Sequence, residues 1–285
     1  MKITKFSTII YVKIKMKINF NKMLGQGGFC RVFEGEKEDK KYAVKIYLKS
    51  EKYIFERESI IHSYLQKKDV DKKYVVPIYD YYSSDDFCYL IMEKMHLSLG
   101  DILKKINITF DEYSIRNIAK SIILSLRFIH KYGICHCDVK PENIIVSKDY
   151  QKIFLIDYGL SRFYRKNGKH IELKTDIMPS GTIKYMSVHT NLKVEISRRD
   201  DLISLGYMLV YLQKKKLPWE EIDRKDRIRR IGEMKLEIDF QQLCENCIPE
   251  LITYFEYCYN LGFEEKPDYQ YLYNLFDKNN LKENV

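Results

Sequence analysis

Two short segments hold the side chains best suited to chemistry. The segment 136–143 carries a carboxylate, an amine and a carboxamide at Asp138, Lys140 and Asn143, and Asp157 lies fourteen residues after Asn143. Apolar runs typical of β-strands come directly after Asn143 and directly before Asp157. Magnesium binds carboxylate and amide oxygens together with phosphate and water. The spacing therefore indicates a metal-bound phosphate and phosphoryl transfer.

The first segment reads H-C-D-V-K-P-E-N, and the triplet that begins at Asp157 reads D-Y-G. They resemble the H-R-D-L-x-x-x-N loop and the D-F-G triplet of protein kinases. The resemblance implies that Asp138 accepts or orients the proton of the attacking hydroxyl, and that Lys140 offsets charge on the phosphate transferred from ATP. It also implies that Asn143 and Asp157 bind Mg²⁺, which Mn²⁺ can replace. Each residue alone could be an ordinary surface residue, but the four together are specific.

A glycine-rich turn, G-Q-G-G-F-C, lies upstream at 25–30. Taken alone, it is matched equally well by an ordinary hairpin turn. However, Val32 and Lys45 follow at the spacing of G-x-G-x-x-G-x-V and A-x-K in kinases, with Cys30 in place of the third glycine. Glu93 and Met95 would bind adenine through their backbone. The full set of ATP-binding residues implied by this resemblance is Leu24, Gly25, Gln26, Gly27, Gly28, Phe29, Cys30, Arg31, Val32, Ala43, Lys45, Met92, Glu93, Met95, Ile145 and Ile156.

Lys45 needs a nearby acid to hold its flexible side chain against the phosphates. Glu56 and Glu58 are both available in the helix that is expected to follow. Only Glu58 precedes the apolar residues Ile61 and Leu65 by three and seven positions, which places it on the inward helix face. We therefore expect Glu58 to pair with Lys45 and Glu56 to be solvated.

Apolar periodicity predicts strands and one helix in the first third of the chain, and mainly helices after it. Strands are expected at 18–25, 31–36, 41–47, 75–82 and 87–93, and helices at 51–66, 97–105, 112–132, 200–211, 226–234, 249–258 and 269–276. The fold class is α+β: a bilobal protein-kinase-like fold with a small antiparallel β-rich lobe, a larger mainly α lobe, and the ligand between them. The expected organisation is a basic extension (1–17), a kinase domain (18–276) with lobes 18–93 and 97–276 and a hinge at 94–96, and a tail (277–285).

The second half of the chain narrows the resemblance to the casein kinase one superfamily. The segments S-G-T-I-K-Y-M-S at 180–187, S-R-R-D-D-L-I-S-L-G-Y at 197–207 and L-P-W at 217–219 resemble that superfamily, in which the A-P-E triplet is normally missing, as it is here. D-Y-G and G-Q-G-G-F are closer to its vaccinia-related kinases, and D-V-K-P is closer to casein kinase one itself, so the branch stays open. The resemblance implies that Asp201 hydrogen-bonds the catalytic-loop backbone and that Thr182 contacts Asp138 and Lys140. The form D-x-K-P-E-N resembles serine/threonine kinases, which implies protein substrates with Ser or Thr hydroxyls.

Cys137 stands where this family has an arginine that pairs with a phosphate on the activation segment, which corresponds to about 157–188 in this chain. We therefore expect activity without phosphorylation of that segment, with a redox-sensitive thiol as the alternative. Casein kinase one relatives also hold an acidic or phosphorylated substrate residue in a basic pocket. Cations at the corresponding positions suggest the same preference, although a solvated basic loop is the alternative. These cations are Lys169, Lys174, Arg224 and Lys225.

Charge and cysteine content argue against a strongly basic nucleic-acid-binding protein and against a secreted disulfide-rich protein. The net charge is +9, but six lysines lie in residues 1–22, which leaves +3 for the remainder. That basic segment indicates at most a diffuse contact with nucleic acid or an acidic membrane. The seven scattered cysteines form no disulfide framework, and the single C-x-x-C at 244–247 is weak evidence of a metal site. Without a signal peptide or a long apolar run, a cytoplasmic or nuclear location is expected. The protein is also expected to be a monomer.

Other readings of the chain remain. The abundance of Lys, Ile, Tyr and Asn resembles the coding bias of AT-rich genomes, such as those of viruses or intracellular parasites. A viral protein of this kind would be expected in the host cytoplasm. A non-catalytic pseudokinase that acts as a scaffold or inhibitor usually lacks the strand lysine, the loop aspartate or the metal aspartate, and this chain keeps all three. A small-molecule kinase is disfavoured by the G-T-x-x-Y segment and the D-D-L helix, which are typical of a peptide-binding lobe.

Overall fold

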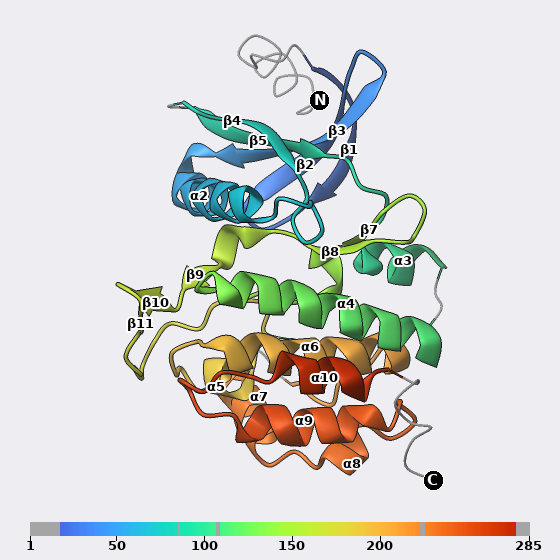
Figure 1. Ribbon diagram of the computed structural model, residues 1–285, viewed down its shortest axis with the longest axis vertical. Coiled ribbons are helices and arrows are strands. Elements are labelled where there is room, and N and C mark those ends of the chain that lie inside the picture. The colour runs from blue at the N-terminus through green and yellow to red at the C-terminus, as the bar shows by residue number, and fades with distance from the viewer. Residues whose placement is uncertain (1–17, 85, 107–108, 223–225, 278–285) are drawn as a thin grey trace. The chain divides into compact units, whose positions relative to one another are not determined.

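The computed structural model describes residues 18–277, except for 85, 107–108 and 223–225 (Figure 1). The chain divides into two compact units, Met1–His96 and Leu97–Val285. The first unit is β-rich and the second is mainly helical, so the expected α+β class is confirmed. The predicted basic extension, and all of the predicted tail except Asp277, lie outside the described residues.

A five-stranded antiparallel sheet forms the first unit, in the order β1-β2-β3-β5-β4. The strands are β1 (Asn19–Gln26), β2 (Cys30–Lys37), β3 (Lys40–Leu48), β4 (Ile78–Ser83) and β5 (Phe87–Glu93). A short turn of helix, η1 (Lys49–Glu51), leads into α2 (Lys52–Lys68), which packs against β3, β4 and β5 (Figure 1).

Alternation along β3 decides which residues face the core of this unit. Tyr42, Val44 and Ile46 point to one side and pack with Tyr89 and Ile91 of β5. Residues 43, 45 and 47 therefore point to the other face of the sheet. Burying each large apolar side chain contributes about 1.5–3 kcal/mol, so a one-residue slip of this strand would be costly.

The strand predicted from residue 75 is too long at its start, because β4 begins only at Ile78. The backbone N–H groups of Tyr74 and Val75 instead donate to the buried carboxylate of Asp69, at 2.7 Å each. Pro77 has no N–H to offer a ladder. The segment 74–77 is therefore a loop that Asp69 ties to the end of α2.

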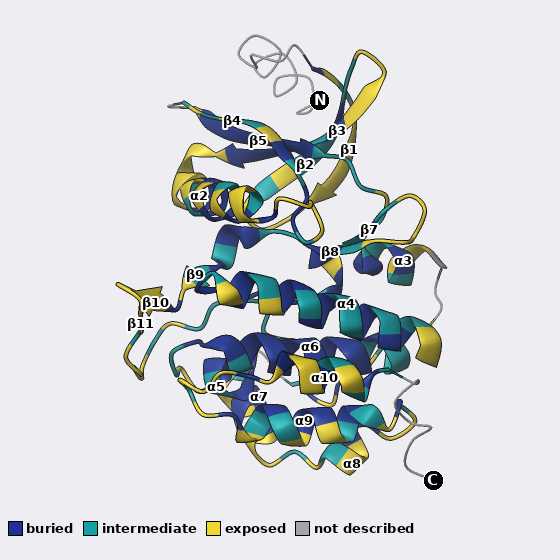
Figure 2. Ribbon diagram, viewed as in Figure 1, coloured by how far each residue is buried: buried dark blue, intermediate teal, exposed yellow. Residues whose placement is uncertain are grey.

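The second unit is built around the buried helix α6. Its longer helices are α3 (Leu99–Ile106), α4 (Glu112–Lys131), α6 (Arg198–Lys214), α7 (Arg227–Leu236), α9 (Glu250–Asn260) and α10 (Tyr269–Leu275), and the short ones are α5 (Val188–Asn191) and α8 (Phe240–Leu243). Figure 2 shows α6 buried along almost its whole length, and it packs against both α4 and α9. Its first turn carries the buried charged residues Arg198, Asp200 and Asp201, and the turns after it are mostly apolar on every side.

Short antiparallel strand pairs complete this unit: β6 (Ile134–Cys135) with β9 (Arg162–Phe163), β7 (Ile144–Val146) with β8 (Ile153–Leu155), and β10 (Arg165–Lys166) with β11 (Lys169–His170). Single helical turns lie at η2 (Pro141–Asn143) and η3 (Tyr158–Leu160). The strands β6 to β8 carry the segments that the sequence assigns to chemistry. No helix in the described part of the chain is both long and apolar enough to cross a membrane.

Candidate functional site

The loop 136–143 connects β6 to β7, and a carboxylate on α6 holds its backbone in place. Asp201 accepts a hydrogen bond from the backbone nitrogen of His136 at 2.7 Å and one from that of Cys137 at 2.8 Å. The expected contact between Asp201 and the loop backbone is thereby confirmed. Because Asp201 lies in the first turn of the buried helix α6, the loop is fixed to the central helix of this unit.

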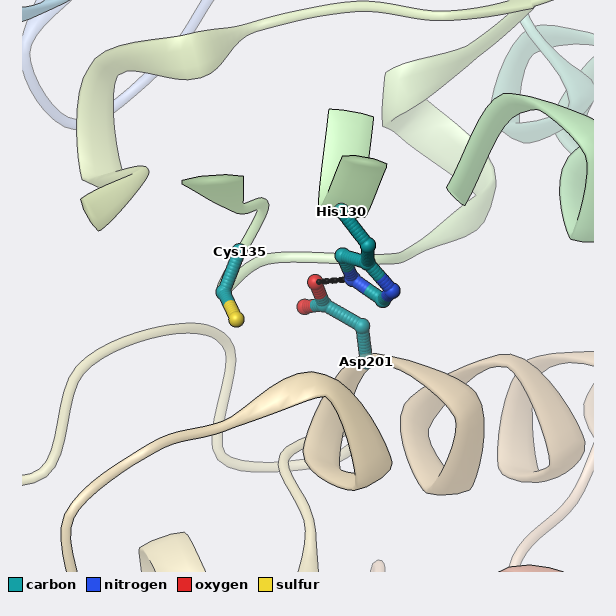
Figure 3. Close-up of side chains that lie close together, drawn as sticks. All are labelled: His130, Cys135 and Asp201. Carbon is teal, nitrogen blue, oxygen red and sulfur yellow. Dashed lines mark hydrogen bonds and ion pairs between the residues drawn. The ribbon is translucent and has the colours of Figure 1, made fainter. Parts of the chain in front are cut away.

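Asp201 also lies close to His130 and Cys135 (Figure 3). One potential metal-ligand atom of each of these three residues lies within 4.8 Å of those of the other two. The cluster nevertheless has the character of a hydrogen-bond network rather than a metal centre. His130 uses Nε2 on Asp201, at 2.9 Å, and Nδ1 on the hydroxyl of Tyr269, at 2.6 Å. Burial raises the pKa of the Cys135 thiol well above its usual value, whereas a metal needs a thiolate.

Asp138 lies at the centre of the loop, 8% exposed, and both of its carboxylate oxygens are engaged. Lys140 Nζ lies 2.6 Å from Oδ2. Thr182 donates to Oδ1 from its backbone nitrogen at 2.9 Å and from its hydroxyl at 2.7 Å. Lys140 Nζ also donates to the Thr182 hydroxyl at 3.0 Å, so the expected contact of Thr182 with this pair is confirmed. The three side chains form a closed arrangement around one carboxylate.

The amide of Asn143 is oriented by the same aspartate. Asn143 Nδ2 donates to the backbone oxygen of Asp138 at 2.9 Å and to its Oδ2 at 3.1 Å. With the nitrogen used in this way, the carbonyl oxygen of Asn143 is the atom that can bind a metal. Ile156 N donates to Asn143 O at 2.9 Å, so the hydrogen bonding between β7 and β8 extends to Asn143 and Ile156. Asp157 is the next residue after Ile156.

Asp157 adopts a left-handed backbone conformation, with φ of +72°. Few residues other than glycine take this conformation, and strain of this kind is common at functional sites. The turn η3 begins directly after it, and Gly159 N donates to Asp157 Oδ1 at 3.4 Å. Asn143 and Asp157 together supply the hard oxygen atoms that Mg²⁺ prefers.

His136 links the two segments through a neutral ring. Its Nδ1 accepts from Asp138 N at 3.3 Å, and its Nε2 bonds the backbone oxygen of Ile156 at 3.0 Å. Burial lowers the pKa of His136 below 6.5, although the nearby carboxylates of Asp201 and Asp138 oppose that shift. A neutral imidazole with the proton on Nε2 satisfies both contacts.

Cys137 is buried in a small cluster with Cys135, Tyr164 and Ile196. Its thiol donates to the backbone oxygen of Cys135 at 3.5 Å, and burial raises its pKa well above the usual value. A buried, protonated thiol reacts slowly, so the geometry favours a packing role for Cys137 over a redox role.

Gly181 lets the activation segment pass directly over this loop. Its φ is +112°, and a Cβ at this position would lie 2.5 Å from the backbone oxygen of Cys137. Only glycine tolerates both the conformation and the close approach. The sequence contains this signal in the S-G-T tripeptide that precedes Ile183, but periodicity alone could not have found it.

In the first unit, the structure brings Lys45 and Glu58 together. Lys45 Nζ lies 2.8 Å from Oε1 and 2.9 Å from Oε2 of Glu58, and the hydroxyl of Tyr47 also donates to this carboxylate. Glu58 is 0% exposed, whereas Glu56 faces solvent. Lys45 of β3 and Glu58 on the inward face of α2 therefore form a buried ion pair.

The other nucleotide-binding candidates of the first unit lie around this lysine on the sheet. Val32 is the cross-strand partner of Lys45, and Met92 is that of Ala43, so these four residues share one face. The glycine-rich turn joins β1 to β2, and Gly27 N donates to Cys30 O at 2.9 Å. Leu24, Gly25, Gln26, Gly28, Phe29 and Arg31 are exposed along it, Glu93 ends β5, and Met95 follows two residues later.

The remaining candidates lie in the second unit. Ile145 on β7 and Ile156, which follows β8, are half-buried. Lys169 is exposed on β11, and Lys174 is exposed with its backbone oxygen bonded to Glu195 N at 2.8 Å. The other two cations of the expected anion pocket, Arg224 and Lys225, lie outside the described residues.

The chain is similar in sequence to known proteins over the segments that carry this site. The sequence model of the protein kinase domain family matches residues 18–262 of the chain. A probable casein kinase I homolog of Encephalitozoon cuniculi (strain GB-M1) is 35% identical over 265 residues, which cover 90% of this chain and 82% of the relative. Both matches include the catalytic loop and the Lys45–Glu58 pair.

Proposed function

Because the chain belongs to the protein kinase family and is casein kinase I-like, we propose that it transfers the γ-phosphoryl group of ATP to Ser and Thr hydroxyls of proteins. The observation that carries this proposal is the arrangement around Asp138. One carboxylate, an amine 2.6 Å away and an oriented carboxamide occupy a single ordered loop. That combination suits phosphoryl transfer, in which the protein mainly positions groups and offsets charge.

Asp138 orients the substrate hydroxyl and accepts its proton. Lys140, already directed at this site by Asp138 and Thr182, offsets the negative charge that moves with the phosphoryl group. The oxygen donors of Asn143 and Asp157 fit Mg²⁺, whose chemistry when bound is to neutralise phosphate oxygens. His136 keeps the two segments that carry these donors in register.

Lys45 binds phosphate oxygens of ATP from the first unit. Its buried contact with Glu58 holds the amine in one place, which lowers the entropy lost when a nucleotide binds. The glycine-rich turn before β2 is open around Gly25 and Gly28, where a Cβ would meet nothing within 4 Å, so phosphate oxygens can approach the backbone closely there. The proposal includes the other ATP-binding candidates on the same sheet face.

Activity without phosphorylation of the activation segment is part of this proposal, and the contacts of Thr182 support it. The segment reaches Asp138 and Lys140 through the hydroxyl and the backbone nitrogen of Thr182. The buried thiol of Cys137 offers no cation for a phosphate to bind. A preference for acidic or pre-phosphorylated substrates rests on the exposed amines of Lys169 and Lys174, and is part of the same proposal.

The test is ATP-dependent phosphorylation of casein by the purified protein with Mg²⁺. Asp138→Asn keeps the size of the side chain and removes its charge, and should abolish transfer. Asp149→Asn is the matched control, because Asp149 is an exposed aspartate in the turn after β7. Equal transfer by wild type and Asp138→Asn would refute the proposed role. Absence of transfer by the wild type, together with Mg²⁺-dependent nucleotide binding, would favour a pseudokinase.

A further inference from the structure

Lys235 on α7 is a buried lysine that the mechanism above does not use. Its side chain is 0% exposed. Its Nζ donates to the backbone oxygen of Met186 at 2.7 Å and to Asn191 Oδ1 at 3.0 Å. The amine also lies over the rings of Tyr207 and Trp219, 4.7 and 4.5 Å from their centroids.

Keeping an amine in such a place is costly. Burial lowers the pKa of Lys235 well below its ordinary 10.5, and no carboxylate of the described residues acts to raise it again. An apolar residue of the same length would fill this space without that cost. Both hydrogen-bond acceptors of Lys235 belong to the activation segment and the helix that follows it. The amine of Lys235 therefore binds the activation segment and α5, which an apolar side chain packed at the same position on α7 could not do.

A continuous path of hydrogen bonds leads from Lys235 to the catalytic aspartate. Lys235 binds the carbonyl of Met186, whose own N–H donates to the backbone oxygen of Thr182 at 3.0 Å. Tyr185 N donates to the same oxygen at 2.8 Å, which closes the turn 182–186. Thr182 then donates from its nitrogen and its hydroxyl to Asp138.

Trp219 supports the same turn at a second point. Its indole Nε1 donates to the backbone oxygen of Lys184 at 2.8 Å. Its ring packs edge-on against Tyr207, with centroids 4.8 Å apart. Two side chains, from α7 and from the segment before it, thus bind two carbonyls of one five-residue turn.

We propose that Lys235 is a positioning residue for phosphoryl transfer: with Trp219 it holds the turn 182–186 so that Thr182 stays bonded to Asp138. The proposal rests on the proposed kinase activity, and deepens it by assigning the fixation of this turn to a lysine. It also accounts for the order of the segment in a chain that has Met-Ser-Val at 186–188 in place of A-P-E.

The test compares Lys235→Met with Thr182→Val and with the double variant. Lys235→Met should lower kcat by about 10-fold or more, with little change in the KM for ATP, because a small displacement of Thr182 affects the chemical step. In the Thr182→Val background the same change should lower kcat by less than about 3-fold, since the hydroxyl contacts that the turn supports are already lost and only the backbone bond from residue 182 to Asp138 remains. Lys214→Met is the matched control: Lys214 Nζ donates to the backbone oxygen of Leu243 at 3.2 Å, away from the activation segment. Its kcat should stay within about 2-fold of the wild type.

A second readout does not depend on activity. Amide hydrogen exchange at Thr182, Tyr185 and Met186 should be faster in Lys235→Met and unchanged in Lys214→Met. If Lys235→Met fails to fold, Trp219→Phe removes the bond to Lys184 O while keeping an aromatic ring at this position, and should give the same pattern in milder form. Effects of Lys235→Met and Thr182→Val that multiply in the double variant, or unchanged exchange at these amides, would overturn the proposal. A wild type without transfer would count against the kinase function alone, because the exchange experiment still reports on the turn.

Discussion

Thr182 donates two hydrogen bonds to one oxygen of Asp138, from its backbone nitrogen at 2.9 Å and from its hydroxyl at 2.7 Å. The hydroxyl also accepts from Lys140, at 3.0 Å. The orientation of the proposed catalytic aspartate is therefore set by the activation segment as well as by its own loop. A change in either segment is expected to alter the reaction.

Replacing the Thr182 hydroxyl tests this arrangement most directly. Thr182→Val keeps the shape of the side chain and removes both contacts of the oxygen, so kcat should fall about 10- to 100-fold while the KM for ATP changes little. Thr182→Ser restores the hydroxyl and should remain within about 3-fold of the wild type. Steady-state kinetics with a protein substrate checks both, and full activity of Thr182→Val would exclude a role for the hydroxyl.

Asp201 should be among the most sensitive positions for stability. Asp201→Asn replaces an acceptor of two backbone N–H bonds by an amide that must point its own NH₂ at one of the donors. We expect the free energy of unfolding to fall by about 3 kcal/mol. Urea titrations measure this, with the exposed Asp149→Asn as a control that should stay within about 0.5 kcal/mol. Equal stability of the two variants would contradict the anchoring role.

The Lys45–Glu58 pair gives a prediction about charge. Lys45→Met leaves the carboxylate of Glu58, which is 0% exposed and accepts from the Tyr47 hydroxyl, without the cation that balances its charge. The substitution should therefore cost about 3 kcal/mol of unfolding free energy. Adding Glu58→Gln removes that charge and keeps an acceptor for Tyr47. The double variant should therefore be more stable than Lys45→Met by about 1–2 kcal/mol. Denaturant unfolding of both variants measures the difference, and additive losses would refute the buried-charge explanation.

Stability should also depend on pH through His136. Burial lowers its pKa in the folded state below 6.5, so below pH 6.5 the unfolded chain binds a proton that the folded chain does not. The free energy of unfolding therefore falls as the pH drops from 6.5 toward the lowered pKa. Unfolding measured at several pH values should show this slope, and His136→Gln should reduce it. A slope unaffected by His136→Gln would contradict the assignment.

Long periodic elements and the catalytic loop could be predicted from the sequence because their signals are local. The helix expected over 112–132 is α4, and the inward position of Glu58 follows from the spacing of apolar residues on its own helix. Contacts to distant backbone atoms leave no such signal. Lys235 lies four residues after Ile231, on the apolar face of α7, but its main acceptor is a carbonyl 49 residues away. No pattern of residue types marks that carbonyl.

A side chain that competes for a backbone N–H group explains why β4 begins at Ile78 and not at residue 75. Val75 and Val76 have high strand propensity and are buried, yet the carboxylate of Asp69 takes the N–H of Val75. The short elements α5 and α8, of four residues each, are below the length at which periodicity is informative. The β10–β11 hairpin has Asn167-Gly168 at its turn, and both residues have positive φ. This dipeptide is a local sequence signal of a hairpin, so the pair could have been predicted from the sequence.

Gly181 has a practical consequence for experiments in cells. One added methyl group at this position would act as a wedge between two backbone segments, because its Cβ would meet the Cys137 carbonyl at 2.5 Å. Gly181→Ala should thus give an inactive protein that keeps every acid, base, amine and metal-binding side chain. Such a reagent would separate effects of phosphorylation from effects of the protein as a scaffold more cleanly than removal of Asp138, since its surface charges stay the same.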